Sequence, residues 1–283
     1  MKTIPIATTT LTEDDRAALA RAKEALERQP LAMKLAAAVG APIERLIERL
    51  PAAAHDTVAA ATRVALEKCL HVALASVPKS GRSAPGPLRP ARDIWHKVAV
   101  ATTGAAGGAF GLMALPAELP VTTALMFRSI CDIARSEGED LNSAEARLQC
   151  LSVFGLGGGA ARHANADEDA DFGYFIARGA LAQAISKASS ELASKGVAAH
   201  GASALMRLTN AIAARFSVQV SEQVAAKSIP AIGAVLGALV NTAFIDHFQQ
   251  TAHGHFAVRR LERQYGSDAV RLAYEAIERS ARG

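Results

Sequence analysis

Histidines and a carboxylate gather near the C-terminus, where Asp246, His247, His253 and His255 fall within ten residues. Imidazole and carboxylate groups are good ligands for zinc, iron and manganese, so a metal site is one interpretation. On a helix, however, Asp246 and His253 would share a side while His247 and His255 would not. The stretch also contains neither HExxH nor a histidine pair four residues apart. The pattern therefore favours histidines that make hydrogen bonds within a helix interface, with no resident metal or cofactor.

Glu118, Arg128 and Asp132 form the second group that could do chemistry. One hypothesis places them in a pocket facing the later stretch, where they would serve acid–base hydrolysis or add Glu118 or Asp132 to a metal site. That candidate pocket consists of Glu118, Arg128, Asp132, Asn241, Asp246, His253, His255 and Arg259. The alternative, which the helical spacing of alternating charges favours, is an exposed ladder of ion pairs formed by Arg128, Asp132, Arg135 and Glu139.

No nucleophile motif accompanies these groups, since the chain contains no GxSxG elbow. Cys69, Cys131 and Cys150 are odd in number, widely spaced and without a CxxC pair, which favours small core residues in a reducing compartment. The opening residues, MKTIPIATTTLTEDDR, lack the apolar core of a signal peptide, so a cytoplasmic location is expected. Together these features favour a protein that is not an enzyme.

Two long uncharged segments accompany the polar groups. Twenty residues between Lys97 and Glu118 carry no charge, and neither do the 18 residues of Ser228–Ile245. Both contain glycines in GxxxG spacing, which lets another helix approach closely. A membrane-spanning helix needs about 20 apolar residues, and the mean hydropathy of the chain is only +0.15. We expect burial in a core or reversible insertion of a helical hairpin between lipids, rather than a polytopic membrane protein.

The composition predicts an all-α fold. Hydrophobic residues make up 50% of the chain and aromatic residues only 5%, which favours closely packed helices over sheets. We expect a multi-helix bundle with two Gly/Ala-rich apolar helices, arranged as helical hairpins, at its centre. The Pro/Gly/Ser/Arg-rich stretch 78–92 is the predicted boundary between an N-terminal helical lead-in and linker (1–91) and a helical domain (92–283) on which it packs.

Capping and periodicity predict individual elements. Thr12 is expected to cap a first helix, Ser143 to cap a helix through Phe154, and a long helix is expected over 203–227. Pro116 and Pro120 predict an abrupt corner in the chain with Glu118 at its centre.

The long helix predicted after Ser228 has an unusual apolar face. Asn241, His255 and Arg259 interrupt a face that carries Phe244, Phe248 and Ala252. Because a buried polar group without a partner costs about 2–7 kcal/mol, all three need partners if they are buried. Gly254 is expected to bend this helix.

The charge is mild, with a formal net charge of +4 and a pI of about 9.1. Lysines and arginines are scattered among acids, and there is no basic stripe with interleaved aromatic residues. This excludes a typical nucleic-acid groove and leaves a weak attraction to an anionic membrane surface.

Three blocks of the sequence, ELPVTTALMFRSICDIARSEGEDL, RLQCLSVFGLGG and IPAIGAVLGALVNTAFIDHFQQTAHGHFAVRRLERQYG, resemble the EcsC protein family. The resemblance spans roughly Lys97 to Gly266. It implies a bacterial, cytoplasm-facing helical protein that can associate with a membrane, and it supplies no catalytic residue. The family takes its name from a protein encoded beside an ABC transporter, so a transporter component is an implied partner.

We therefore expect a membrane-associated or lipid-interacting helical accessory protein, peripheral to or partly inserted in the inner face of the cell membrane. The alternative is a metal-dependent or acid–base hydrolase with its site between the Glu118/Asp132 helix and the Asp246/His255 helix. The sequence leaves the oligomeric state open.

Overall fold

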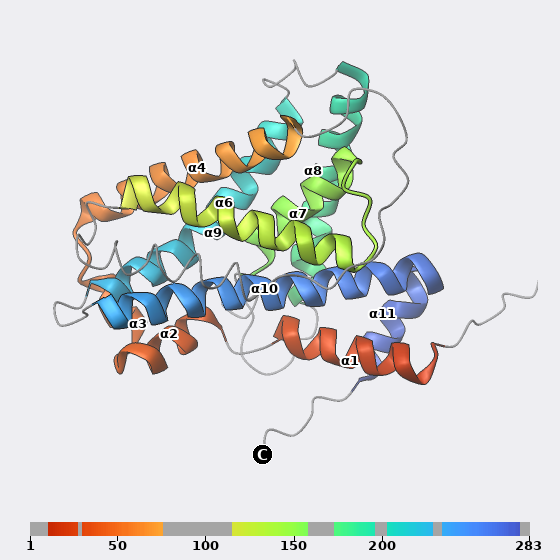
Figure 1. Ribbon diagram of the computed structural model, residues 1–283, viewed down its shortest axis with the longest axis horizontal. Helices are drawn as coiled ribbons and strands as arrows, with labels where there is room; N and C mark the ends of the chain where they lie inside the picture. The colour runs from red at the N-terminus through yellow and green to blue at the C-terminus, as the bar shows by residue number, and fades with distance from the viewer. Residues whose placement is uncertain are drawn as a thin grey trace, which may run out of the picture.

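The computed structural model describes residues 11–27, 30–75, 115–157, 173–195, 203–228 and 234–277, and within these ranges all regular structure is helical (Figure 1). This confirms the all-α prediction. The helices are α1 (Glu13–Glu27), α2 (Leu31–Val39), α3 (Ile43–Glu48), α4 (Ala52–Ala75), α6 (Leu115–Ser136), α7 (Ala144–Leu156), α8 (Gly173–Lys195), α9 (Ser203–Lys227), α10 (Ala234–Tyr265) and α11 (Ser267–Ala276).

The 32-residue helix α10 is the central element of the bundle. It packs against α1, α2, α6, α7, α9 and α11. Figure 1 shows α6 running along one side of α10 in the same direction, with α1 and α2 on the other side. The α4 helix packs against α6, α7 and α9, so the N-terminal helices share contacts with the rest of the described chain.

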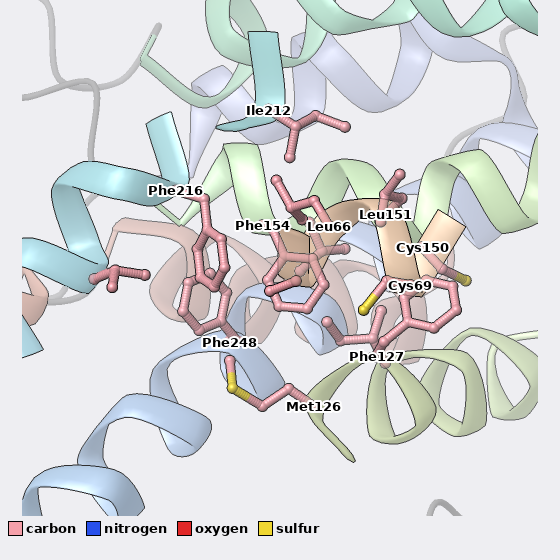
Figure 2. Packing of buried hydrophobic residues seen from close by; sticks show 14 of the residues in the cluster. Leu66, Cys69, Met126, Phe127, Cys150, Leu151, Phe154, Ile212, Phe216 and Phe248 are labelled. Atoms are coloured by element: carbon pink, nitrogen blue, oxygen red, sulfur yellow. The ribbon is translucent and has the colours of Figure 1, made fainter. Parts of the chain in front are cut away.

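Four phenylalanines form the centre of the main core. Phe154 of α7 lies 4.8 Å from Phe216 of α9 and 5.4 Å from Phe248 of α10, measured between ring centroids. Phe244 adds a further ring 5.2 Å from Phe248, and Figure 2 shows three of these rings facing one another. Phe244, Phe248 and Ala252 are fully buried, which confirms the apolar face predicted for this helix.

A smaller hydrophobic cluster lies between the C-terminal half of α10 and the helices α1, α8 and α11. Its buried members are Leu19, Ala22, Tyr174, Val258, Leu261, Val270 and Tyr274. The Tyr174 and Tyr274 rings stack with centroids 6.3 Å apart. The first and last helices of the described chain are therefore joined through α10.

The α10 helix continues through Gly254 without a break, and the bend expected at this glycine stays a prediction. The structure assigns Gly254 a role in close approach. A Cβ at this position would lie 2.6 Å from Leu26 Cγ and 2.9 Å from the Ala22 carbonyl oxygen, both on α1. Glycine at 254 thus sets the distance between α1 and α10.

The corner predicted around Glu118 is wrong, because α6 begins at Leu115 and contains Pro120. Pro116 falls in the first turn, where backbone N–H groups have no partner within the helix. Pro120 has no N–H, so one backbone hydrogen bond of the helix is missing there. Its fixed φ is compatible with a helix, and a proline this near the helix start does not end it.

The capping predictions are confirmed at two helix starts. Thr12 Oγ1 accepts a hydrogen bond from Asp15 N at 3.2 Å, and Ser143 Oγ accepts one from Ala146 N at 3.3 Å. The helix predicted over 203–227 has those bounds as α9. At the last helix, Gly266 with φ of +88° is the capping residue, and Ser267 is the first helical one.

Two sequence-based predictions lie outside the described residues. The glycines at 104, 107, 108, 111 and 233 fall in undescribed segments, so the two central Gly/Ala-rich hairpins stay a prediction. The proposed boundary near residue 92 lies in the undescribed range 76–114.

We predict that Gly254→Ala destabilises the protein by about 1–3 kcal/mol, because the added methyl meets the Ala22 carbonyl oxygen of the α1 backbone as well as the Leu26 side chain, and the backbone cannot move aside. Urea unfolding monitored by circular dichroism measures the change.

Gly179→Ala is the matched control, since Gly179 is also helical and a Cβ there has nothing within 4 Å among the described atoms. This change should stabilise the protein by up to about 1 kcal/mol through helix propensity. Equal shifts for the two variants would contradict the close-approach role of Gly254.

Candidate functional site

The polar side chains of α10 meet partners at three levels along its length. At the N-terminal level Asn241 contacts Glu118 of α6, at the middle Gln249 contacts Ser129, and at the C-terminal level Arg259 contacts Glu139. The order of these contacts shows that α6 and α10 run parallel and in a fixed register. The three polar groups expected to need partners, on Asn241, His255 and Arg259, all have them.

The N-terminal cluster is a buried ion pair with two amides. Glu118 Oε1 accepts hydrogen bonds from Lys227 Nζ at 2.6 Å and from Asn241 Nδ2 at 3.2 Å. Gln223 Nε2 donates to Asn241 Oδ1 at 2.8 Å. The Glu118 and Lys227 side chains are only 10% and 12% exposed. The structure thus brings together Glu118 and Asn241, two candidate pocket residues, with Gln223 and Lys227, which sequence analysis missed.

A signal for these missed residues is present on α9. Gln219, Glu222 and Gln223 are polar residues at spacings of three and four, and all three are at most 4% exposed. A polar stripe that recurs at helical spacing between apolar residues indicates a face that pairs with another polar face.

Asp246 lies at the middle level. Gln250 Nε2 donates to Asp246 Oδ2 at 2.5 Å, and Lys34 Nζ of α2 donates to Gln250 Oε1 at 2.9 Å. These contacts join α2 to α10 and place Asp246 in a short polar chain at the bundle surface.

The C-terminal cluster is built from arginines and glutamates. Glu139 accepts hydrogen bonds from Arg259 at 2.8 and 3.3 Å and also pairs with Arg263. Arg178 of α8 forms a bidentate pair with Glu262, with hydrogen bonds of 2.8 Å from Nη1 and 2.5 Å from Nη2. Glu139 therefore binds across to α10, whereas the ladder hypothesis assigned it to the exposed face of α6.

His255 is fully buried in this region. Its Nδ1 lies 2.9 Å from the Tyr174 hydroxyl, and no group in the described ranges pairs with its Nε2. Burial, reinforced by the charges of Arg178 and Arg259, holds the pKa of His255 well below its usual value. The imidazole is consequently neutral at physiological pH. Burial likewise raises the pKa of Tyr174 to about 12, so its hydroxyl stays protonated.

His247 is a second neutral, buried imidazole. Its Nε2 lies 2.6 Å from the Gly157 carbonyl oxygen, and because a carbonyl only accepts, this nitrogen carries the proton. Burial is the main cause that lowers its pKa to about 4, with a smaller contribution from the Lys34 charge and opposition from Asp246 and the hydrogen bond.

Arg128, Asp132 and His253 are the remaining candidate residues. Arg128 is exposed on α6. Asp132 pairs with Arg135 at 2.6 Å, as the ladder hypothesis expected. His253 is partly buried on α10. Asn241 and His255 are 14 residues apart on one continuous helix, about 21 Å at about 1.5 Å per residue, so Glu118 and His255 lie at different levels of the bundle.

In the described part of the chain, no three His, Cys, Asp or Glu side chains come together in a way that could hold a metal ion. The weak metal candidates instead make separate contacts. Asp246 binds Gln250, His247 binds the Gly157 carbonyl, and His255 binds Tyr174.

The three cysteines, distant in sequence, lie on neighbouring helices. The Cys150 thiol interacts with Cys131, and Cys131 also influences Cys69. Figure 2 shows Cys69 and Cys150 beside Phe127. Burial raises the pKa of Cys69 to about 12 and that of Cys150 well above its usual value. Both are protonated core residues, as expected, although their convergence could not be foreseen from their spacing.

Comparison with known proteins identifies the family. The sequence model of the EcsC protein family matches residues 13–261. The chain belongs to the EcsC protein family. No curated protein and no solved structure is detectably similar to it. The match extends the EcsC resemblance from the 97–266 blocks to the N-terminal helices, and it includes every candidate pocket residue of this EcsC-family protein.

We predict that the stability of the protein falls by about 2 kcal/mol between pH 7.5 and pH 5 through His247 alone. The folded pKa, about 4, lies below the unfolded value of 6.5. Between these values the unfolded chain binds the proton more readily, so stability is lost as the pH falls. Urea unfolding at a series of pH values measures the slope.

His247→Gln keeps a hydrogen-bond donor for Gly157 but does not titrate, so it should reduce this slope by the His247 contribution and leave that of His255. The exposed His55 supplies the matched control, His55→Gln, which should leave the slope unchanged. An unaltered slope in His247→Gln would contradict the prediction.

We also predict that Glu118→Ala destabilises the protein by about 3 kcal/mol, because it leaves the Lys227 ammonium buried without its carboxylate. The exposed i,i+4 pair between Arg271 and Glu275 gives the control. Glu275→Ala should cost less than about 0.5 kcal/mol. Chemical denaturation of both variants is the measurement, and similar losses would show that the Glu118 pair is not effectively buried.

Proposed function

We propose that this EcsC-family protein is a membrane-associated, lipid-interacting accessory protein that acts at the inner face of the cell membrane without a reaction of its own. The observation that carries the proposal is the chemistry of one end of the bundle. There α6 and α10 begin, the long uncharged segment enters α6, and apolar side chains are exposed.

Two exposed apolar residues flank the Glu118 cluster in sequence. Val121 on α6 is 52% exposed and Leu239 on α10 is 50% exposed. Glu118 and Asn241, which lie within a turn of them, are in direct contact, so Val121 and Leu239 belong to the same end of the bundle. Large apolar side chains exposed at one end of a bundle favour an apolar partner.

The pairing of Glu118 with Lys227 makes this end compatible with a lipid surface. Glu118 is the first charged residue after the uncharged segment, and Lys227 precedes the uncharged stretch that leads into α10. Because the two charges neutralise each other inside the bundle, this pair presents little net charge to a surface that approaches this end. Isolated charges there would incur a desolvation cost.

The uncharged segment 98–117 supplies the apolar length for such contact. It enters α6 at Leu115 and ends four residues before Val121. No helix within the described ranges has the length and apolar character needed to cross a bilayer. Contact of the exposed end with the lipid surface, together with reversible insertion of the uncharged segment, fits both observations. A transporter component is the proposed protein partner, and this part rests on the family resemblance alone.

The test is flotation of the purified protein with vesicles of phosphatidylcholine, with and without phosphatidylglycerol. The double variant Val121→Asp/Leu239→Asp should reduce the vesicle-bound fraction about tenfold or more, because burying each apolar side chain contributes about 1.5–3 kcal/mol.

Leu272→Asp provides the matched control, since Leu272 is 68% exposed but lies on α11, next to the C-terminal end of α10. It should float like the unmodified protein. Failure of the unmodified protein to float with either vesicle, or equal flotation of the double variant, would overturn the proposal. Release by high salt would indicate surface attraction to the anionic lipid rather than insertion.

A further inference from the structure

A polar groove of about 430 Å³ lies between α7 and α8 and ends at α10. Its hydrogen-bonding residues come from three helices. They are Glu145 and Gln149 of α7, Arg178, Ser186, Ser189 and Ser190 of α8, and Arg259 of α10. None of these except Arg259 was singled out by sequence analysis, and the groove lies about 27 Å along α10 from Asn241.

Gln149 is the most informative residue of the groove. It is only 7% exposed, it lines the groove, and no hydrogen bond to its side-chain amide occurs within the described ranges. Its backbone carbonyl oxygen accepts a hydrogen bond from Ser152 Oγ. A glutamine that is nine-tenths buried, lines a polar groove and has no side-chain hydrogen bond among the described residues indicates a site that receives a polar ligand.

The two arginines are held in place by carboxylates on other helices. Glu262 binds two terminal nitrogens of Arg178, and Glu139 binds Nε and Nη2 of Arg259. Arg178 also lies over the Tyr174 ring, with its Cζ 6.0 Å from the ring centroid. Arg259 Nη1 donates to no group in the described ranges, so it can donate to a ligand. Fixed guanidinium groups lose little conformational entropy on binding.

The serines supply the opposite wall. Ser186, Ser189 and Ser190 are spaced three and four residues apart, so their hydroxyls lie on one face of α8. Their neighbours Ala182 and Ala193 also line the groove and leave room because their side chains are small. Hydroxyl, amide and guanidinium groups all donate hydrogen bonds, and they converge on one space from α7, α8 and α10.

We propose that this groove binds a phosphate group, carried by inorganic phosphate, a soluble phosphomonoester or a lipid headgroup. A tetrahedral phosphate presents acceptor oxygens in several directions, which suits donors from three helices. The volume of the groove exceeds that of phosphate alone and leaves space for an organic substituent. The proposal concerns other residues than the membrane-facing end and stands whether or not that end binds lipid.

Glu145 allows a test that is specific to an anionic ligand, because its charge opposes phosphate binding. Its side chain is 54% exposed at the rim of the groove, and its Oε1 lies 3.9 Å from Arg259 Nη2. A phosphate in the groove would be repelled by this carboxylate and would compete with it for Arg259. Removing the charge of Glu145 should therefore strengthen phosphate binding, whereas removing the Gln149 amide should weaken it.

The experiment is isothermal titration calorimetry of the full chain at low ionic strength with inorganic phosphate, glycerol 1-phosphate and, as the uncharged match, glycerol. Gln149→Leu should weaken binding of the two phosphates about tenfold, as expected for the loss of one hydrogen bond to a charged group. Glu145→Gln should tighten it severalfold. Because the Gln149 amide has no hydrogen-bond partner among the described residues, Gln149→Leu should unfold no more easily than the unmodified chain.

Gln183→Leu is the control, since Gln183 is an exposed glutamine of α8 that does not line the groove. It should bind phosphate like the unmodified protein. No heat of binding with either phosphate, or the same affinity in Gln149→Leu, Glu145→Gln and Gln183→Leu, would overturn the proposal.

Vesicles distinguish the sources of the phosphate. Flotation that requires phosphatidic acid and is lost in Gln149→Leu would identify a lipid headgroup. Calorimetric binding of glycerol 1-phosphate without such flotation would identify a soluble ligand. The Val121→Asp/Leu239→Asp protein should bind inorganic phosphate normally, so failure of the membrane proposal and failure of this one give different results.

Discussion

The need to pair the polar groups buried on α10 governs the arrangement of the bundle. Asn241, His247, Gln249 and His255 are all within the interior, and each unpaired group would cost about 1–3 kcal/mol. Their partners lie on α6, α8 and α9 and in the turn after α7, so each contact fixes one neighbouring helix in register. Apolar packing alone would tolerate a shift of one helix along another. The polar contacts remove that freedom, because a shift of one turn would leave several groups unpaired at once.

The low aromatic content determines how these helices pack. Most of the interior is alanine, leucine, valine and isoleucine, and the phenylalanine rings are concentrated where α7, α9 and α10 meet. Small side chains allow close approach of helices, as Gly254 does where α10 faces Leu26 and Ala22 of α1. Close approach brings short polar side chains such as Ser129 within reach of α10. The alanine-rich composition and the interior hydrogen bonds are therefore linked, since the second depends on the first.

Sequence periodicity predicted what depends on local spacing. The bounds of α9, the caps at Thr12 and Ser143, and the buried face of Phe244 and Phe248 all follow from patterns within one helix. The proline corner failed because the effect of a proline depends on its distance from the helix start, which the pattern did not give. The convergence of the cysteines and the pairing of Lys227 with Glu118 depend on how distant helices pack. For the site, Glu118 and Asn241 were placed together, but the length of α10 separates them from His255.

The two ends of α10 differ in how completely the polar groups around them are hydrogen-bonded to one another. At the N-terminal end, Glu118, Lys227, Asn241 and Gln223 satisfy one another, and the charges cancel inside the bundle. At the C-terminal end, carboxylates hold Arg178 and Arg259 while the Gln149 amide has no partner in the described ranges. A closed network stabilises a fold but offers nothing to a polar ligand. An open one leaves an amide without a partner among the described residues, and a fold that keeps such a group beside two fixed arginines has the donors for an anion already in place.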